Sequence, residues 1–547
     1  MKTKGFNCIK KCEIIFVFAI ILILQIIVSA FYMNCKQFMH CDELFCYEGA
    51  HNAMLYRFGD VKFRLLTDEG WWNAWHTREE FMEHFEVRGD ESILSHSLSE
   101  VKDSLKTKNV YYILLNIAVS LQNDPAMTKW SGFMLNIIFF ILHQILLFLI
   151  GKEIFHDKRK ALLPMIIYGF SAGAISLIVY IRFYVLKSLL CLLIAYIHIK
   201  LMERQNLWGV IAAYVVTGLA TLALYGNQPY IVIYMASAVF VFMITCLICR
   251  QYKLLLKYIG AGFMGVLTVV LFVPTVTSRL LGYAESEYGV TAINNFFRGS
   301  IREYAKWAFY YGRDILHHTT AGIYGAILLM IMFAVIWYLQ KRKGKLQWKK
   351  LEYLNAKACF MIGTSICYYI IFCKVTFTVE YRYVSCIYPG ICVGIAVFLD
   401  WLLEFGSIRK RGIAICAVVL AGLLICHIKS YIYEIYPEAA DMREELAKYP
   451  DADNVYVFRD PYIGQYYRDG YLSNEGTRQY LMNPDDIDSI DYGFLDELNG
   501  AGFLCWFPFA LSDEEIDSTL NHILSHTMYA DCKKMLTTYE CDVYYVY

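Results

Sequence analysis

Charged residues are scarce in this sequence of 547 residues. Asp, Glu, Lys and Arg together make up 18% of it, whereas ordinary soluble domains contain about 25%. Hydrophobic residues make up 58%. This composition excludes a disordered chain, a basic nucleic-acid-binding protein and a simple cytosolic enzyme. We therefore expect no nucleic-acid partner.

Several motifs that mark catalytic sites are also missing. The sequence has no Gly-rich phosphate loop, no GxSxG elbow and no HExxH pair, so it offers no visible site for nucleotide-driven chemistry. No CxxC pair lies in a region expected to be soluble, which argues against a zinc knuckle. No cofactor is firmly implied, and a divalent metal has no support in the sequence. Six cysteines are expected outside the membrane, either free or joined by a disulfide: Cys35, Cys41, Cys46, Cys505, Cys532 and Cys541.

Long apolar runs are what the sequence has in abundance. A helix needs about 20 apolar residues to cross the hydrocarbon core of a bilayer. The first run is too long for a signal peptide and lacks a small-residue cleavage site, so we expect it to be an anchor. We predict eleven spans, near residues 13–33, 130–150, 161–181, 183–201, 207–225, 229–249, 258–276, 319–339, 356–374, 384–403 and 412–430.

The distribution of charge predicts the orientation of these spans. Alternate connections hold 23 Lys and Arg residues, and the positive-inside rule places them in the cytoplasm. They are 1–12, 151–160, 200–206, 250–257, 340–357 and 405–411. The N-terminus is then cytoplasmic and the C-terminus extracytoplasmic. The apolar segment 110–121 is too short to span and would reverse this pattern, so we expect an interfacial helix on the outer face.

The C-terminal part of the chain differs from the rest. Residues 437–547 hold 22 acidic and 7 basic residues, a net charge of −15, so residues 1–436 carry +15. Strands are predicted at 454–458, 502–507 and 541–547, and a helix at 512–525. We therefore predict an α-helical, multi-pass cell-membrane protein: a transmembrane domain of residues 1–436 followed by a small extracytoplasmic α/β domain of residues 437–547. External loops are expected at 34–129 and 277–318.

An acidic pair, Asp42 and Glu43, follows the first predicted span directly. Partial burial near a membrane surface raises a carboxyl pKa and suits a general base. The alternative, favoured by spacing alone, is that the pair only caps a juxtamembrane helix. His40 beside Asp42 suggests a metal, but no distant third ligand supports one.

Four cations on the predicted outer side are not explained by the orientation rule. Lys106 and Lys108 precede the interfacial helix, and Arg182 and Arg382 lie at the outer ends of spans. Such cations attract phosphate groups, although ordinary interfacial anchoring is the alternative for each. In the first external loop, the tryptophan-rich segment 71–75 is expected to be interfacial or to stack on a sugar.

Short motifs along the chain resemble the integral-membrane glycosyltransferases of the GT-C fold, especially the bacterial relatives of protein O-mannosyltransferases and aminoarabinose transferases. The acidic motif with an aromatic residue after the first helix matches Asp42, Glu43 and Phe45. A Tyr-Tyr and Leu-rich helix matches the sequence YYILL at 111–115. The remaining matches are IRFY at 181–184, Arg382-Tyr383 and Tyr388-Pro389.

This resemblance implies that the chain transfers a sugar from a polyprenyl-phosphate-linked donor in the lipid bilayer to a glycan, lipid or protein acceptor. It implies catalytic roles for Asp42 and Glu43. The cations would bind the lipid phosphate: Lys106, Lys108, Arg182 and Arg382. The substrate would contact Tyr111, Tyr184 and Tyr383.

The chain departs from the family where relatives usually carry His-Pro-Pro or Lys-Pro-Pro before the Tyr-Tyr pair. Here those positions hold Thr107-Lys108-Asn109, so Lys108 or Lys106 would have to supply the cation. Two alternatives therefore remain. One is a transporter, flippase or polymerase of lipid-linked saccharides, and the other is an inactive scaffold with this fold.

Overall fold

The protein is described here from a computed structural model. The described residues are 2–51, 72–83, 85–87, 89–97, 100, 110–121, 129–203, 205–224, 230–272, 287–320, 322–342, 355–377, 380–405, 432–458, 466, 470–483, 492–498 and 500–547. The chain divides into two compact units. The helical unit comprises residues 1–30, 136–178 and 183–432, and the mixed unit comprises residues 31–135, 179–182 and 433–547.

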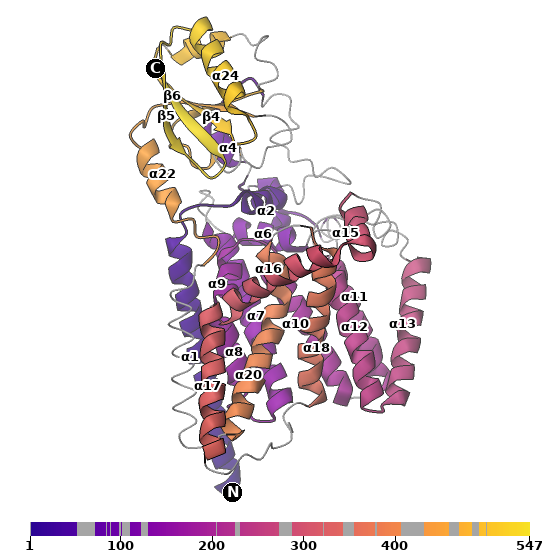
Figure 1. Cartoon of the computed structure of the whole chain (residues 1–547). Coiled ribbons are helices and arrows are strands. Elements are labelled where there is room, and N and C mark those ends of the chain that lie inside the picture. The colour runs from indigo at the N-terminus through magenta and orange to yellow at the C-terminus, as the bar shows by residue number, and fades with distance from the viewer. Residues whose placement is uncertain are drawn as a thin grey trace. The chain divides into compact units, whose positions relative to one another are not determined.

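Long helices make up the helical unit (Figure 1). α1 (Lys2–Cys35) begins in this unit and ends in the mixed unit. The other helices are α7 (Lys129–Phe155), α8 (Leu162–Gly169), α9 (Ala172–Val179), α10 (Tyr184–Glu203), α11 (Leu207–Leu224), α12 (Tyr230–Ile248), α13 (Tyr252–Phe272), α15 (Glu287–Arg298), α16 (Ile301–Thr320), α17 (Ile323–Arg342), α18 (Ala356–Val375), α19 (Tyr381–Val384) and α20 (Tyr388–Phe405).

Among the described residues, seven helices are long and apolar enough to cross a membrane, or up to nine if two bent pairs each count as one span. The bent pairs are α8 with α9, at 61°, and α16 with α17, at 72°. The chain is therefore a multi-pass membrane protein, as predicted. The exact number of eleven is not confirmed, because the predicted span 258–276 overlaps α13 without being among the seven, and 412–430 lies outside the described residues.

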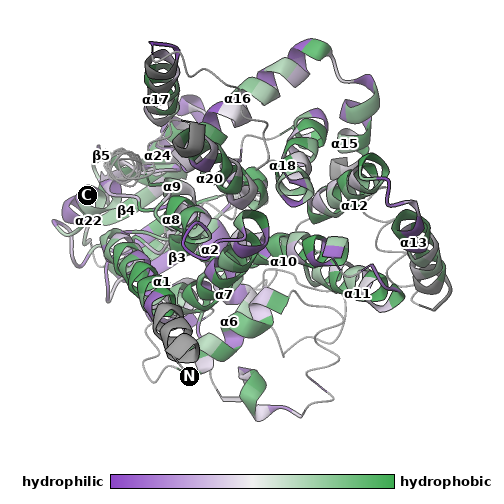
Figure 2. Ribbon diagram, turned by 90° about the horizontal axis from the view of Figure 1, so that it is seen from below, coloured by the Kyte–Doolittle hydropathy of each residue, from purple (hydrophilic) through white to green (hydrophobic). Residues whose placement is uncertain are grey.

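Hydrophobic residues dominate these helices (Figure 2). Some buried polar side chains bond within their own helix, such as Ser29 to the carbonyl of Gln25, and others bond to a neighbouring helix, because lipid offers them no water. Gln25 on α1 donates to the carbonyl of Met165 on α8 at 2.9 Å. His198 on α10 lies 2.7 Å from the Tyr258 hydroxyl on α13. These contacts hold helices together without adding a charge to the bilayer.

In the mixed unit, the segment 34–129, which is the predicted first external loop, contains α2 (Cys41–His51), α4 (Arg78–Glu83) and α6 (Val110–Ser120). The short apolar helix predicted at 110–121 is thus present as α6, and its position at a membrane surface stays a prediction. α6 packs against α2. Its buried Asn116 donates to the carbonyls of Ala50 and Glu91 and accepts from the amide of Ile93, at 2.8–2.9 Å. These bonds satisfy a polar side chain that burial would otherwise penalise.

A six-stranded mixed sheet forms the other half of this unit. Its order is β1-β3-β2-β4-β6-β5. The central strands β3, β2 and β4 are parallel, and the outer pairs are antiparallel. The strands are β1 (Trp75–Thr77), β2 (Asn454–Val457), β3 (Arg478–Met482), β4 (Phe503–Pro508), β5 (Cys532–Thr537) and β6 (Cys541–Val546). The strands predicted at 454–458, 502–507 and 541–547 are present as β2, β4 and β6, whereas β1, β3 and β5 were not predicted.

The segment 34–129 contributes β1 to this sheet, so the predicted domain of residues 437–547 shares its sheet with an earlier part of the chain. Trp75 of β1 packs edge-on against Tyr480 of β3 and donates to the carbonyl of Phe494 at 3.2 Å. The guanidinium carbon of Arg478 lies 4.6 Å from the centre of the Trp75 ring. Within the tryptophan-rich segment, Trp75 is thus part of the sheet.

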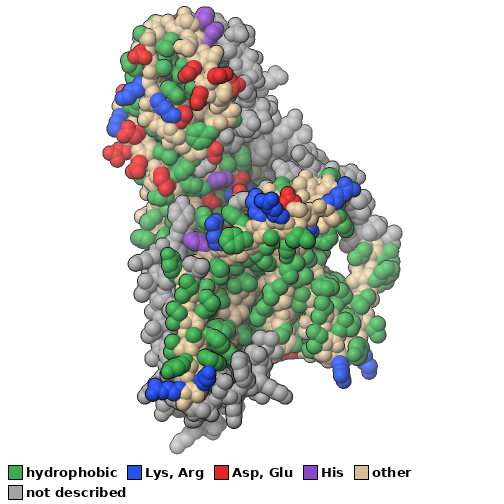
Figure 3. Space-filling view, in the orientation of Figure 1, with side chains coloured by type: hydrophobic (Ala, Val, Ile, Leu, Met, Phe, Trp, Pro, Cys, Tyr) green, Lys and Arg blue, Asp and Glu red, His purple; other side chains and the backbone are tan. Residues whose placement is uncertain are grey.

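One face of the sheet is covered by α24 (Asp513–His526), the helix predicted at 512–525. Its buried residues Ile516, Leu520 and Ile523 recur at helical spacing and pack in the apolar core of the sheet. Burying each such side chain stabilises a fold by about 1.5–3 kcal/mol. Ser512 and Glu515 form a reciprocal cap at the start of the helix. Acidic side chains lie on the surface of this region (Figure 3).

The six cysteines expected outside the spans are all free thiols in the structure. Cys46, Cys505 and Cys541 are buried, and Cys35, Cys41 and Cys532 are partly buried. The sequence left open whether these cysteines are thiols or form a disulfide, and in the structure all six are thiols.

The cap of α24 predicts the effect of one substitution on stability. Ser512→Ala removes a side chain that accepts the Glu515 amide, and we expect the free energy of unfolding of this unit to fall by about 1 kcal/mol. Urea-dependent pulse proteolysis of the full-length protein in nanodiscs measures it. Ser525→Ala, in the last turn of the same helix, is the matched control and should change stability by less than about 0.5 kcal/mol. Equal effects of the two variants would contradict the role of the cap.

Candidate functional site

The site begins where the first helix ends. α1 ends at Cys35, a non-helical stretch covers residues 36–40, and α2 begins at Cys41. Asp42 and Glu43 therefore occupy the first turn of α2, where negative charge is favourable. Successive residues of a helix point about 100° apart. The two adjacent carboxylates consequently have different surroundings.

Asp42 is the more accessible of the two acids, with 21% of its side chain exposed. Its Oδ2 accepts a hydrogen bond from the Tyr180 hydroxyl at 2.8 Å. Its Oδ1 lies 3.4 Å from Nη2 of Arg182. Nη1 of Arg182 also donates to the main-chain carbonyl of Asp42 at 2.7 Å. A partly solvated carboxylate is thus held in place by a phenol and a guanidinium.

The charge of Arg182 is secured by the same contacts. Burial is the largest single influence and lowers its pKa, but Asp42 together with Cys46, Tyr180 and Tyr112 more than offsets burial and holds the pKa well above its usual value. Arg182 therefore stays cationic, and 14% of its side chain remains exposed. Such a group can neutralise an anion that approaches Asp42.

Glu43 is completely buried and differs from Asp42 in every contact. Lys36 donates to Oε1 and Oε2 at 2.9 and 2.8 Å. The amide of Ile181 donates to Oε1 at 2.7 Å, and the amide of His40 donates to Oε2 at 2.8 Å. Burial raises the pKa of Glu43, and the Lys36 ammonium opposes that shift. Lys36 also donates to the carbonyl of Glu434 at 2.8 Å.

Aromatic side chains surround the acidic pair. Tyr47 and Tyr111 are fully buried, and burial raises the pKa of both phenols, so they stay neutral. Burial also raises the pKa of the Cys46 thiol to about 12, which makes it unreactive. Gly49 is required on α2, because a Cβ there would lie 2.9 Å from the ring of Tyr112 on α6.

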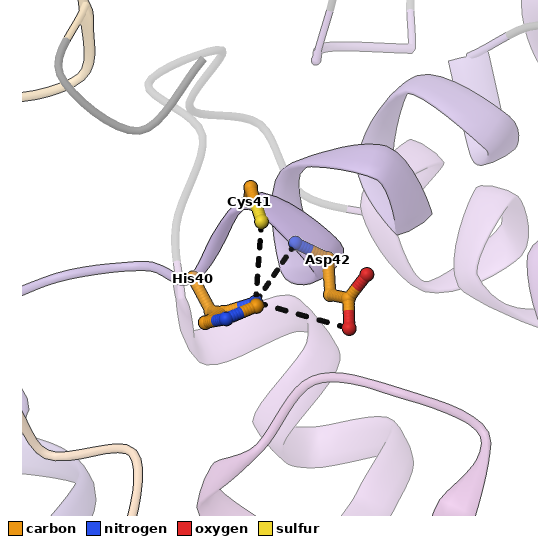
Figure 4. A group of neighbouring side chains, drawn as sticks. All are labelled: His40, Cys41 and Asp42. Atoms are coloured by element: carbon orange, nitrogen blue, oxygen red, sulfur yellow. Dashed lines mark hydrogen bonds and ion pairs between the residues drawn. The ribbon is translucent and has the colours of Figure 1, made fainter. Parts of the chain in front are cut away.

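Three consecutive residues present a set of atoms that a metal ion accepts as ligands (Figure 4). One atom each from His40, Cys41 and Asp42 lies within 4.8 Å of the others. Nδ1 of His40 is 3.5 Å from Sγ of Cys41 and 3.8 Å from Oδ2 of Asp42. The same Nδ1 also accepts the Asp42 amide at 3.0 Å. Its lone pair is thus engaged by the backbone, and a metal would have to displace that bond.

The helical unit holds a second group of predicted residues. Arg382, at the start of α19, lies 3.0 Å from a carboxylate oxygen of Glu380, and 8% of its side chain is exposed. Its guanidinium carbon is 5.9 Å from the ring centre of Tyr184. Nζ of the buried Lys187 donates to the carbonyls of Arg382 and Tyr383, at 3.0 and 3.2 Å. Lys187 thereby stabilises the backbone on which Arg382 sits.

The structure thus gathers the predicted residues in two groups, one in each unit. Asp42, Glu43, Arg182 and Tyr111 belong to the mixed unit. Arg382, Tyr184 and Tyr383 belong to the helical unit. Lys106 and Lys108, like the aligned segment 107–109, lie outside the described residues.

Three residues in these groups were not predicted. Lys36 and Lys187 could have been found from the sequence, because a lysine at the predicted outer end of a span, or within a span, runs against the charge distribution of membrane proteins. Tyr180 is two residues before Arg182, but nothing in the sequence indicates that its hydroxyl reaches Asp42. Only the fold brings them together.

Comparison of the sequence with protein-family models and with curated proteins finds no match. Solved structures do match. The crystal structure of ArnT, an aminoarabinose transferase, from Cupriavidus metallidurans bound to undecaprenyl phosphate is 12% identical, with a TM-score of 0.50 over 97% of both chains. ArnT of the same organism in the apo state is also 12% identical, with a TM-score of 0.48 over 100% of this chain and 98% of that one.

These matches extend over nearly the whole chain, whereas the motifs of the sequence were short. At 12% identity, the match with a TM-score of 0.50 establishes the fold alone. The chain therefore has the fold of ArnT, which is the GT-C fold.

Proposed function

We propose that this protein transfers a sugar from a polyprenyl-phosphate-linked donor to an acceptor hydroxyl at the outer face of a cell membrane. The observation that carries the proposal is the part-exposed carboxylate of Asp42, held by Tyr180 and Arg182, in a chain with the ArnT-type fold. The similar ArnT structure is bound to undecaprenyl phosphate. A lipid-linked donor also agrees with the lack of any nucleotide motif in the sequence.

Asp42 is the general base in this proposal. Its carboxylate takes the proton of the acceptor hydroxyl while the hydroxyl oxygen forms a bond to the anomeric carbon. The bond from that carbon to the phosphate oxygen breaks, and its electron pair leaves with the polyprenyl phosphate. The Tyr180 hydroxyl and the Arg182 guanidinium keep the carboxylate oriented toward the acceptor.

The leaving phosphate needs cations, because negative charge accumulates on it as the bond breaks. We assign this role to Arg182 and Arg382, together with Lys106 and Lys108, as the resemblance implies. Lys187 supports Arg382 by holding its main-chain carbonyl.

The aromatic residues Tyr111, Tyr184 and Tyr383 are proposed to line the path of the substrate. Tyr184 lies beneath the Arg382 guanidinium. Because Glu43 is buried and accepts bonds at both oxygens, we assign proton transfer to Asp42 and a supporting role to Glu43.

The proposed orientation follows the positive-inside rule. The N-terminus lies in the cytoplasm, and the acidic region 437–547 lies outside, where its charge of −15 keeps it from an anionic membrane surface. There it caps the site or helps to bind the acceptor.

The first prediction of this mechanism concerns Asp42→Asn. The amide cannot take a proton, so sugar transfer should fall by at least about 100-fold, while retention of undecaprenyl phosphate stays close to that of the wild type. Transfer from a panel of polyprenyl-phosphate sugars, in membranes containing the full-length protein, measures the first quantity. Native mass spectrometry measures the second.

Asp441→Asn is the matched control for Asp42→Asn, because Asp441 is an exposed acid on α22 (Glu438–Leu446). Transfer should be unchanged in that variant. Unchanged transfer by Asp42→Asn would remove Asp42 as the base. A wild-type chain that retains the lipid but transfers no sugar from any donor would instead indicate a transporter or an inactive scaffold.

The second prediction concerns the phosphate. Arg382→Gln removes a charged donor, and hydrogen bonds to charged groups contribute about 1.5–3 kcal/mol, so the KM for the donor should rise roughly 10- to 100-fold. Arg302→Gln, at an exposed arginine of α16, is the control. If both variants keep the wild-type KM, Arg382 does not bind the donor.

A further inference from the structure

Lys36 is a lysine that the proposed chemistry does not use, yet its side chain is completely buried. Its ammonium bonds both oxygens of Glu43 and the main-chain carbonyl of Glu434. Burying a lysine costs free energy unless its charge is paired and its three N–H groups find acceptors. All three contacts are made with carboxylate or carbonyl oxygens at 2.8–2.9 Å, so each N–H group of the ammonium has an acceptor.

The partners of this ion pair come from parts of the chain that are far apart in sequence. Lys36 follows α1, and Glu43 lies in the first turn of α2. Glu43 also accepts the amide of Ile181, which lies between Tyr180 and Arg182. Glu434 belongs to the segment 433–436, here called the tail connector, which leads from the helical unit into the C-terminal residues. One ion pair thus joins three separate stretches of the mixed unit.

The backbone of the tail connector is strained. Glu434 has a φ of 67° and Tyr436 has a φ of 53°, values in the left-handed region that side chains other than Gly disfavour. Such a backbone persists only when its surroundings hold it. Here the Lys36 ammonium holds the Glu434 carbonyl, and the amide of Gln37 donates to the carbonyl of Ile435 at 3.0 Å.

The tail connector also lies against the residues that flank Asp42. The ring of Tyr436 stacks on that of His40, with centres 6.4 Å apart and an interplanar angle of 25°. His40 in turn accepts the Asp42 amide. The Lys36 ammonium is 5.6 Å from the centre of the Tyr436 ring. Displacement of the tail connector would therefore change the position of His40 and of the first residues of α2.

We propose that Lys36 and Glu43 are positioning residues that hold Tyr180 and Arg182 against Asp42 and that couple this arrangement to the tail connector. Glu43 accepts a hydrogen bond from the amide of Ile181, the residue between Tyr180 and Arg182. This bond fixes the backbone from which the side chains of Tyr180 and Arg182 reach Asp42. Glu43 acts through its neighbours and takes no proton from the acceptor. The effect of this positioning on turnover rests on the proposed function, whereas the coupling between the ion pair and the tail connector does not.

Hydrogen exchange tests the coupling without any assay of activity. In full-length Lys36→Met, protection should fall about tenfold in two segments together: residues 180–182, where the amide of Ile181 donates to Glu43, and residues 437–440, where the amide of Ala439 donates to the Tyr436 carbonyl of the tail connector. Each of these acceptors loses the group that holds it in place. Neither segment contains the substitution. Exchange that increases only near residues 36–43 would overturn the proposal.

Lys129→Met is the matched control for this experiment. The Lys129 ammonium donates to the carbonyls of Asn34 and Lys36, at 3.3 and 2.6 Å, rather than to a carboxylate. We expect protection at residues 180–182 and 437–440 to stay at the wild-type level in that variant. A loss equal to that in Lys36→Met would show general destabilisation and would contradict a specific role for the ion pair.

A second variant covers the case in which Lys36→Met fails to fold, since that substitution leaves Glu43 as a lone buried charge. Lys36→Met combined with Glu43→Gln buries no net charge, and the Gln oxygen still accepts one amide. We expect this double variant to fold, to retain part of the protection at residues 180–182 and to lose protection at residues 437–440. Wild-type protection at both segments would overturn the proposal.

Activity then separates positioning from a purely structural role. In Glu43→Gln, kcat should fall with little change in the KM for the donor, because Asp42 and Arg182 remain present but less well oriented. The pH dependence of kcat should shift as well, since the contact of Arg182 with Asp42 is altered. A rise in the KM for the donor as large as the fall in kcat, with an unchanged pH dependence of kcat, would contradict a positioning role. Absence of sugar transfer by the wild type would refute the proposed function and leave the exchange result standing.

Discussion

The buried ion pair between Lys36 and Glu43 is the interaction on which the site depends. Its two charges stay stable without water only because the pair also receives two backbone amides and donates to one carbonyl. The requirement to satisfy both charges forces three distant segments to meet. Order at the membrane exit of α1 is thus a consequence of electrostatics rather than of apolar packing alone.

Asp42 and Glu43 show that surroundings, and not residue type, decide what a carboxylate does. The two acids are adjacent on one helical turn. One is solvent-accessible and contacts a phenol and a guanidinium, whereas the other is enclosed by permanent partners. The neutral tyrosines and the neutral Cys46 around them add no competing charge. A reactive group and its support can therefore be neighbours in sequence.

Residues that violate the usual distribution of charge in membrane proteins were predictable from the sequence. Arg182 and Arg382 were singled out for that reason, and both prove to be held against carboxylates. The spans, the helix at 110–121 and the apolar strands of the tail followed from the position and length of apolar runs in the sequence. β1 and β5 did not, since β1 has three residues and β5 alternates poorly, with Lys533 and Lys534 adjacent. The contact between Tyr180 and Asp42 depends on folding over a long separation, which no local pattern encodes.

The membership of β1 in the sheet has a consequence for biosynthesis. Trp75 leaves the ribosome long before Tyr480, its partner across the sheet, has been made. While the later helices are being inserted, the hydrogen-bonding groups of β1 and the ring of Trp75 do not yet have their partners in β3. The sheet closes only after β6 (Cys541–Val546) has been made, because β6 lies between β4 and β5. Completion of this unit thus depends on residues made on both sides of the long helices in the sequence.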